Sequence, residues 1–145
     1  MKSILVAVDG SKRSDMIVKF ASQLARGFGA KILIVYISPT STIPDEYKSL
    51  KGEELWKAEE SENRVICERI VSDMGEILKK EDIEFESVCA MGHAASKILE
   101  IAETHQVDLI VLGVVGLHGL GTIRALGSVA RRVIERSRIP LVLVP

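Results

Sequence analysis

The sequence predicts an α/β fold, a single-domain open five-stranded parallel sheet with helices on both faces. Short apolar runs alternate with stretches of helical periodicity along the whole chain. Most of these runs are apolar at consecutive positions, which indicates strands buried on both faces of a parallel sheet. The 145 residues suffice for one domain, spanning 1–145. The predicted strands are Ile4–Val8, Ile32–Ile37, Ile83–Met91, Leu109–Leu112 and Leu141–Val144.

The segments between these strands have the periodicity of amphipathic helices. The first helix follows a capping Ser11 or Ser14, places Phe20 and Phe28 on its apolar face, and ends at Gly27 and Gly29. A long helix follows, and two shorter ones precede and follow the fourth strand. These three helices are predicted over Glu53–Lys80, with Trp56, Ile66 and Ile70 on the apolar face, over Ala95–His105 and over Val129–Arg136.

The strand order follows from the polarity of the third strand. Glu84 and Glu86 alternate there with Ile83 and Phe85, so one face of this strand is wet, as expected at an edge. The first and fourth strands belong at the centre, which gives the order 3-2-1-4-5. Ligands of open α/β sheets bind where the strand order reverses, beyond the carboxyl ends of the strands. The sequence therefore predicts a site between Asp9 and the glycines that begin at Gly113.

The composition argues against several classes of partner. The 19 basic and 20 acidic residues nearly cancel and aromatic residues are 4% of the chain, so no nucleic-acid partner is expected. No apolar stretch is long enough to span a membrane or to act as a signal peptide. Cys67 and Cys89 have no metal-ligand spacing and are interpreted as two buried thiols. Together these features predict a cytoplasmic protein.

A glycine-rich segment follows the fourth predicted strand. Five glycines lie between Gly113 and Gly127, in GVVGLHGLGTIRALG, directly before a helix whose first turn has no carboxylate. Glycines allow backbone N–H groups to approach a phosphate, and a helix N-terminus favours anions. The Walker pattern fails because Thr122 and Ile123 stand where Lys and Ser/Thr are needed, and Arg124 breaks the dinucleotide fingerprint. A purely structural loop is the alternative interpretation.

The chain resembles the universal stress protein family. The resemblance rests on ILVAVDGS, on MGHAASKILEIAETHQVDLIVLG, on the segment from Gly113 to Ser128 and on the closing IPLVLVP. It implies an adenine nucleotide alpha hydrolase-like fold and, in ATP-binding members, a loop of the form Gly-x2-Gly-x9-Gly followed by Ser or Thr. Here Gly113, Gly116, Gly127 and Ser128 match, although the last spacer has ten residues and Val114-Val115 replaces a polar pair.

The resemblance also implies the contacts of the nucleotide. Asp9 would contact adenine or ribose, Ala7 and Val8 would line the base, and Tyr36 would flank it. A capping role for Asp9 and core packing for Tyr36 are the structural alternatives. The complete expected set is Ala7, Val8, Asp9, Tyr36, Leu112, Gly113, Gly116, Gly127, Ser128 and Val129.

These observations predict that the chain is an ATP-binding regulatory protein of the stress response. Mg²⁺ is expected to accompany the nucleotide. A protein partner is also expected, which the sequence does not identify. The longer spacer favours the alternative of a nucleotide-independent interaction module. Slow ATP hydrolysis is a third hypothesis, although no acid–base–nucleophile set is evident and no catalytic residue is assigned. A homodimer is expected through Leu141–Val144, because an uncharged edge strand is a template for pairing.

Overall fold

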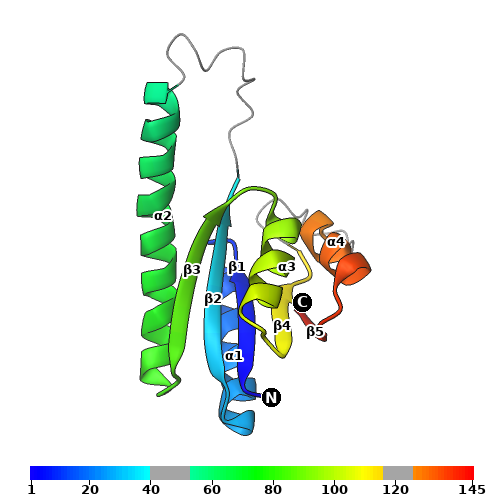
Figure 1. Cartoon of the computed structure of the whole chain (residues 1–145). Coiled ribbons are helices and arrows are strands. Elements are labelled where there is room, and N and C mark those ends of the chain that lie inside the picture. The colour runs from blue at the N-terminus through cyan, green and yellow to red at the C-terminus, as the bar shows by residue number, and fades with distance from the viewer. Residues whose placement is uncertain (40–52, 116–125) are drawn as a thin grey trace.

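The structure is a computed structural model that describes residues 1–39, 53–115 and 126–145. Strands and helices alternate along the chain (Figure 1). The elements are β1 (Ser3–Val8), α1 (Arg13–Phe28), β2 (Lys31–Ser38), α2 (Glu53–Lys80), β3 (Phe85–Met91), α3 (Ala94–Thr104), β4 (Leu109–Gly113), α4 (Ser128–Arg136) and β5 (Leu141–Val144). In the part of the chain that the structure describes, no helix is both long and apolar enough to cross a membrane.

The five strands form one parallel sheet in the order β3-β2-β1-β4-β5, which confirms the predicted topology. β3 lies at one edge, as the alternation of Glu84 and Glu86 predicts. It begins at Phe85, two residues later than expected, because the N–H of Ile83 donates to the Leu78 carbonyl (3.0 Å) and so belongs to the turn that follows α2.

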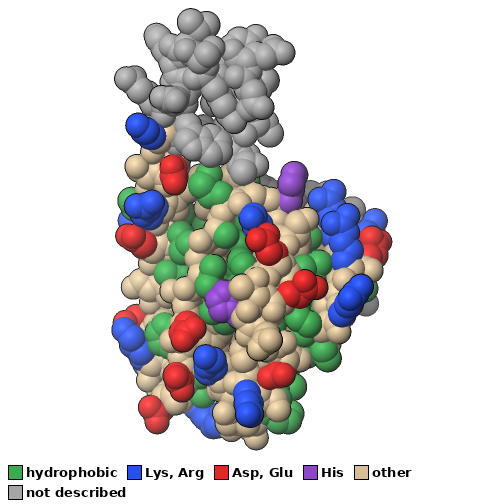
Figure 2. All heavy atoms as spheres, in the orientation of Figure 1, with side chains coloured by type: hydrophobic (Ala, Val, Ile, Leu, Met, Phe, Trp, Pro, Cys, Tyr) green, Lys and Arg blue, Asp and Glu red, His purple; other side chains and the backbone are tan. Residues whose placement is uncertain are grey.

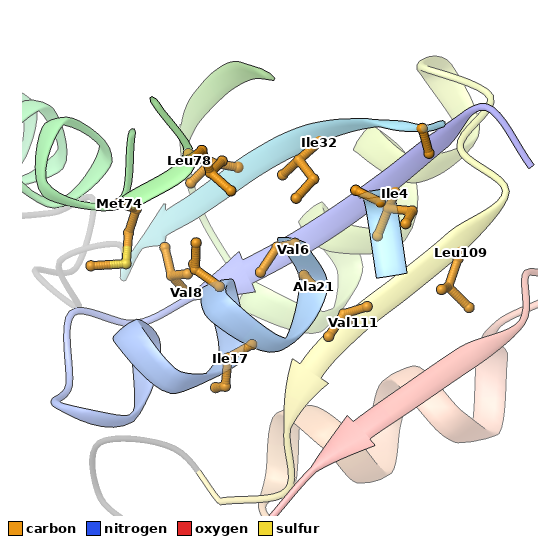
Figure 3. Packing of buried hydrophobic residues seen from close by; sticks show 14 of the residues in the cluster. Ile4, Val6, Val8, Ile17, Ala21, Ile32, Met74, Leu78, Leu109 and Val111 are labelled. Atoms are coloured by element: carbon orange, nitrogen blue, oxygen red, sulfur yellow. The ribbon is translucent and has the colours of Figure 1, made fainter. Parts of the chain in front are cut away.

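Each face of the sheet carries its own apolar core. α1 and α2 cover one face, where Ile4, Val6 and Val111 of the strands pack against Ile17 and other helix side chains (Figure 3). α3 and α4 cover the other face, with their own buried alanine, isoleucine and valine side chains. Side chains alternate between the two faces along each strand, so β1, β4 and β5 are apolar at consecutive positions, whereas the edge strand β3 carries polar side chains.

The helices differ from the predictions mainly at their ends and margins. The residue at the N-cap position of α1 is Lys12, and neither Ser11 nor Ser14 caps the helix with its side chain. α1 continues through Gly27 and ends at Gly29, whose left-handed conformation stops the helix. Three side chains expected on apolar faces are instead solvent-exposed: Phe20 (37%), Phe28 (57%) and Ile66 (45%). The predicted position of Trp56 lies outside the described side chains.

The prediction of two buried thiols is wrong. Cys67 of α2 and Cys89 of β3 form a disulfide, with their Cα atoms 6.2 Å apart. Cys67 is buried, but Cys89 is exposed on the edge strand. The two cysteines lie 22 residues apart in sequence, and only the packing of α2 along β3 brings them together. The argument for a reducing compartment that rested on them is therefore removed.

Candidate functional site

The reversal of strand order lies between β1 and β4, where predicted site residues meet at the carboxyl ends of the strands. Val8 is in register with Tyr36 of β2, and Gly113 is in register with Val144 of β5. The last pair between β1 and β4 is Val6 with Val111, so Val8 and Gly113 each lie two residues beyond it, at the ends of their strands. Asp9 follows Val8 directly. The structure therefore brings the turn after β1 beside the end of β4, the position at which open α/β sheets bind ligands.

Asp9 organises the turn that joins β1 to α1. Its Oδ1 atom accepts hydrogen bonds from the Ser11 backbone N–H (2.9 Å) and the Ser14 hydroxyl (3.2 Å). Ser14 Oγ also lies 3.4 Å from the Asp9 backbone N–H, which donates to it. These bonds give Asp9 a structural role close to the capping alternative, although α1 has no side-chain cap of its own. All of its side-chain hydrogen bonds within the described residues end on Oδ1, whereas Oδ2 takes no part in them.

Gly10 allows this turn to lie close against α2. Its φ of +80° is a conformation that residues with a side chain rarely adopt. A Cβ atom added at Gly10 would lie 2.8 Å from Cδ1 of Ile70, a side chain of α2 that packs against the core. The Gly10 turn, by which we mean residues 9–14, is thus supported from α2 as well as from α1.

Ser11 is a further candidate site residue, which the sequence pattern predicts only as a helix cap. Its Oγ is buried and has no hydrogen-bond partner among the described residues. A buried hydroxyl costs free energy unless it is hydrogen-bonded, so Ser11 Oγ is a candidate to bind a ligand at this turn. The signal in the sequence is Asp-Gly-Ser directly after an apolar strand.

The two ends of the glycine segment, Val114 and Gly127, lie side by side. The Val114 N–H donates to the Val144 carbonyl (2.9 Å), and the Gly127 N–H donates to the Val114 carbonyl (2.8 Å). Gly127 therefore lies beside Val114, the residue that directly follows β4. Gly113 also has a packing function, because a Cβ atom there would lie 3.0 Å from Cδ1 of Ile17. Gly116, the other glycine of the predicted motif, lies outside the described residues.

The N-terminus of α4 completes this end of the sheet. Gly127 is the N-cap residue and Ser128 is the first helical residue, and among the described residues no side chain caps the first N–H groups of the helix. The first turn has no acidic residue, and Arg131 and Arg132 are exposed just after it. Lys and Arg side chains gather over α4 in the space-filling view (Figure 2). Both the helix dipole and these cations favour an anion at this N-terminus.

The predicted residues do not share one face of the sheet. Val8 and Tyr36 pack with the core beneath α1 and α2, which agrees with the alternative of core packing for Tyr36. Ala7 and Leu112 belong to the core beneath α3 and α4. Only a ligand that crosses the ends of the strands would contact both groups. Val129, in the first turn of α4, is 36% exposed.

Comparison with known proteins identifies relatives along the whole chain. The model of the Universal stress protein family matches residues 1–145. Universal stress protein MJ0531 of Methanocaldococcus jannaschii is 34% identical over 99% of this chain and 81% of its own. Universal stress protein YxiE of Bacillus subtilis is 30% identical over 97% of both chains.

Solved structures share the fold. The hypothetical protein MJ0577 superposes with a TM-score of 0.82 at 22% identity, over 99% of this chain and 94% of its own. The universal stress protein of Archaeoglobus fulgidus in complex with dAMP has a TM-score of 0.67 at 26% identity, over 100% and 98% of the two chains. A universal stress protein in complex with cAMP has a TM-score of 0.67 at 25% identity, over 99% and 95%. Because the family model and two curated relatives match essentially the full length, the chain belongs to the universal stress protein family.

Proposed function

We propose that this chain is a regulatory protein of the stress response that binds an adenine nucleotide, with ATP as the expected ligand. The observation that carries the proposal is that the Gly10 turn and the N-terminus of α4 both lie at the carboxyl ends of β1 and β4, where the strand order reverses. A carboxylate on one side and anion-binding N–H groups on the other match a ribose and its phosphates. The dAMP and cAMP complexes of two structural relatives support the same ligand class.

The described residues fit such a ligand in three respects. Asp9 Oδ2 can accept a hydrogen bond from ribose or base while Oδ1 keeps the turn in place. Ser11 Oγ needs a hydrogen-bond partner. The N–H groups of Ser128 and Val129 lie in the first turn of α4, without a side-chain cap. No group of three or more His, Cys, Asp or Glu in the described ranges could hold a metal, so Mg²⁺ would be bound by the phosphates and water.

Calorimetric titration of ATP with Mg²⁺ into protein first stripped of nucleotide tests the proposal. We expect binding to ATP, and weaker binding to GTP because the base contacts are assigned to adenine. AMP and cAMP in the same titration establish which phosphates are recognised. A flat titration at millimolar ATP with magnesium would refute nucleotide binding.

A nucleotide-independent interaction module is a second candidate, and one observation favours it. Both backbone groups of Val114 already form hydrogen bonds within the protein, so its N–H cannot also bind a phosphate. Mass spectrometry of the freshly purified, denatured protein discriminates between the candidates. Adenine nucleotide that co-purifies with the chain contradicts the second one.

In either case we propose a homodimer through β5. This strand is at the edge of the sheet, and among the described strands it pairs with β4 alone. Leu141, Val142 and Leu143 are each partly exposed and carry no charge. Pairing of β5 with its copy around a two-fold axis would hydrogen-bond both edges and bury these side chains.

A further inference from the structure

The disulfide between Cys67 and Cys89 joins α2 to the sheet at the level of the candidate site. Cys89 is in register with Tyr36, and Tyr36 is in register with Val8, so the three residues form one row across β3, β2 and β1. Asp9 begins one residue after this row. The disulfide is therefore two strands away from the Gly10 turn along the sheet.

A shorter connection to the same turn runs through α2. Cys67 and Ile70 are three residues apart in the helix and so lie on the same face, one turn from each other. Ile70 is the residue whose Cδ1 atom lies against Gly10, at 2.8 Å from the position of an added Cβ. Fixing Cys67 to β3 thus fixes the part of α2 that supports the Gly10 turn.

The N-terminal part of α2 supplies little other support for this region. Cys67 is the first buried residue of α2 among its described side chains, and Val65 and Ile66 just before it are 61% and 45% exposed. Figure 1 shows the helix continuing past the ends of the strands beyond this level. After Cys67 the next buried residue is Met74, and Ile70 and Val71 between them are only partly buried. The disulfide therefore adds a covalent attachment of α2 to the sheet one turn before its contact with Gly10, beside the apolar contacts of Ile70 and Val71.

We propose that Cys67–Cys89 is a thiol–disulfide exchange site whose oxidised form holds Ile70 against the Gly10 turn and thereby raises the nucleotide affinity. The reductant would be a dithiol that reaches the exposed Cys89, because Cys67 is only 1% exposed. The second half of the proposal, the change in affinity, rests on the proposed nucleotide-binding function.

Reduction of the cysteine pair proceeds in two exchange steps. A thiolate of the reductant attacks Cys89 Sγ, the S–S bond breaks, and its electron pair leaves with Cys67 Sγ, which takes up a proton. The second thiolate of the reductant then attacks the reductant's own sulfur in the mixed disulfide and releases Cys89, which is also protonated. Two electrons and two protons reach the cysteine pair, and the reductant leaves as a disulfide. Reoxidation reverses these steps.

The experiment compares the oxidised full-length protein with the same protein reduced by dithiothreitol without denaturant. Amide hydrogen exchange at Ser11 and Ser14, whose N–H groups hold the turn, gives a readout that needs no nucleotide. We expect exchange at these amides to be about fivefold or more faster after reduction, and ATP to bind about fivefold or more weakly. Ellman's reagent counts the thiols released. Circular dichroism confirms that the reduced protein stays folded.

Variants identify the cause of any difference. The double substitution Cys67→Ser with Cys89→Ser should behave like the reduced protein and should not respond to dithiothreitol. Ile70→Ala should make exchange and affinity equal in the two redox states, because it removes the contact with Gly10. Ser87→Ala, on the same strand two residues from Cys89 and without a role in the disulfide, should respond to reduction like the unmodified protein.

Each outcome decides one half of the proposal. Unchanged exchange at Ser11 and Ser14 after complete reduction overturns it, whether or not nucleotide binds. Faster exchange with equal ATP affinity overturns the link to the nucleotide site. Faster exchange in a protein that binds no nucleotide in either state supports the redox control of the turn, and refutes the proposed function instead.

Discussion

Replacing Gly10 with alanine should destabilise the protein through two separable effects. The φ of +80° costs an L-residue about 1–2 kcal/mol. The new methyl group would also lie 2.8 Å from Ile70 Cδ1, which must move away from a preferred rotamer at a cost of about 0.5–1.5 kcal/mol. We therefore expect a loss of about 2 kcal/mol in the free energy of unfolding, which lowers the Tm of a chain of this size by about 6 °C.

Gly27→Ala is the matched control. Gly27 lies within α1, its φ is not positive, and an added Cβ would meet no atom within 4 Å. Because alanine favours the helix over glycine, this substitution should raise the free energy of unfolding by about 0.5–1 kcal/mol. Thermal and urea unfolding followed by circular dichroism measure both variants.

A double-mutant cycle with Ile70→Val separates the two effects at Gly10. Valine lacks the Cδ1 atom, so Ile70→Val should cost about 0.5–1.5 kcal/mol alone and clearly less beside Gly10→Ala. The part of the loss that comes from the positive φ should remain. If the two substitutions are additive, or if Gly10→Ala is as harmless as Gly27→Ala, the close contact between the Gly10 turn and α2 is refuted.

Further substitutions test the site, the interface and the electrostatics. Gly127→Val should fold, because its φ of −60° and ψ of 155° suit any residue, yet it should weaken ATP binding by about 2 kcal/mol or more by blocking backbone approach; intact affinity in calorimetry would make Gly127 a packing residue. Asp9→Ala should weaken the binding of adenosine as well as of ATP, whereas Asp9→Asn should retain the turn; equal adenosine affinity in the alanine variant and the unmodified protein would leave Asp9 with its structural role alone. Replacing Val142 and Val144 with lysine should give a folded monomer in light scattering, and a persistent dimer at micromolar concentration would place the interface elsewhere. Hydrogen bonds from the backbone N–H groups of residues 2 and 3 lower the pKa of Asp108, so its stabilising effect should be present at neutral pH and lost as the pH falls through that lowered pKa. Acid unfolding of Asp108→Ala should then meet that of the unmodified protein at low pH, and a difference independent of pH would contradict the assignment.

The topology could be predicted because each strand carries its own signal. Runs that are apolar at consecutive positions can be buried only between two layers of helices, and the glutamates before and within β3 mark an edge. The orientation of helix side chains was harder to predict. In α1 the buried stripe contains Ile17, Val18, Ala21 and Ala25, so Phe20 lies at its margin although its spacing fits a helical pattern.

The sequence pattern does not predict contacts between segments that are distant along the chain. A disulfide needs two Cα atoms at a suitable distance, and nothing in the spacing of Cys67 and Cys89 indicates that a helix passes the edge strand there. The orphaned hydroxyl of Ser11 was missed for a similar reason, since burial depends on what surrounds the turn. The point where the strand order reverses, at which the candidate site is expected, could be predicted because it depends on strand order alone.

The hydrogen bond between Gly127 and Val114 has a consequence for how the family can vary. It ties together the two ends of a segment of 12 residues, 115–126, so the strand and helix on either side are fixed independently of what lies between. Lengthening such a closed segment by one residue adds only about 0.1 kcal/mol of closure entropy. A change of one residue in the length of this segment should therefore be nearly neutral for folding, so the ten-residue spacer does not by itself disturb the scaffold.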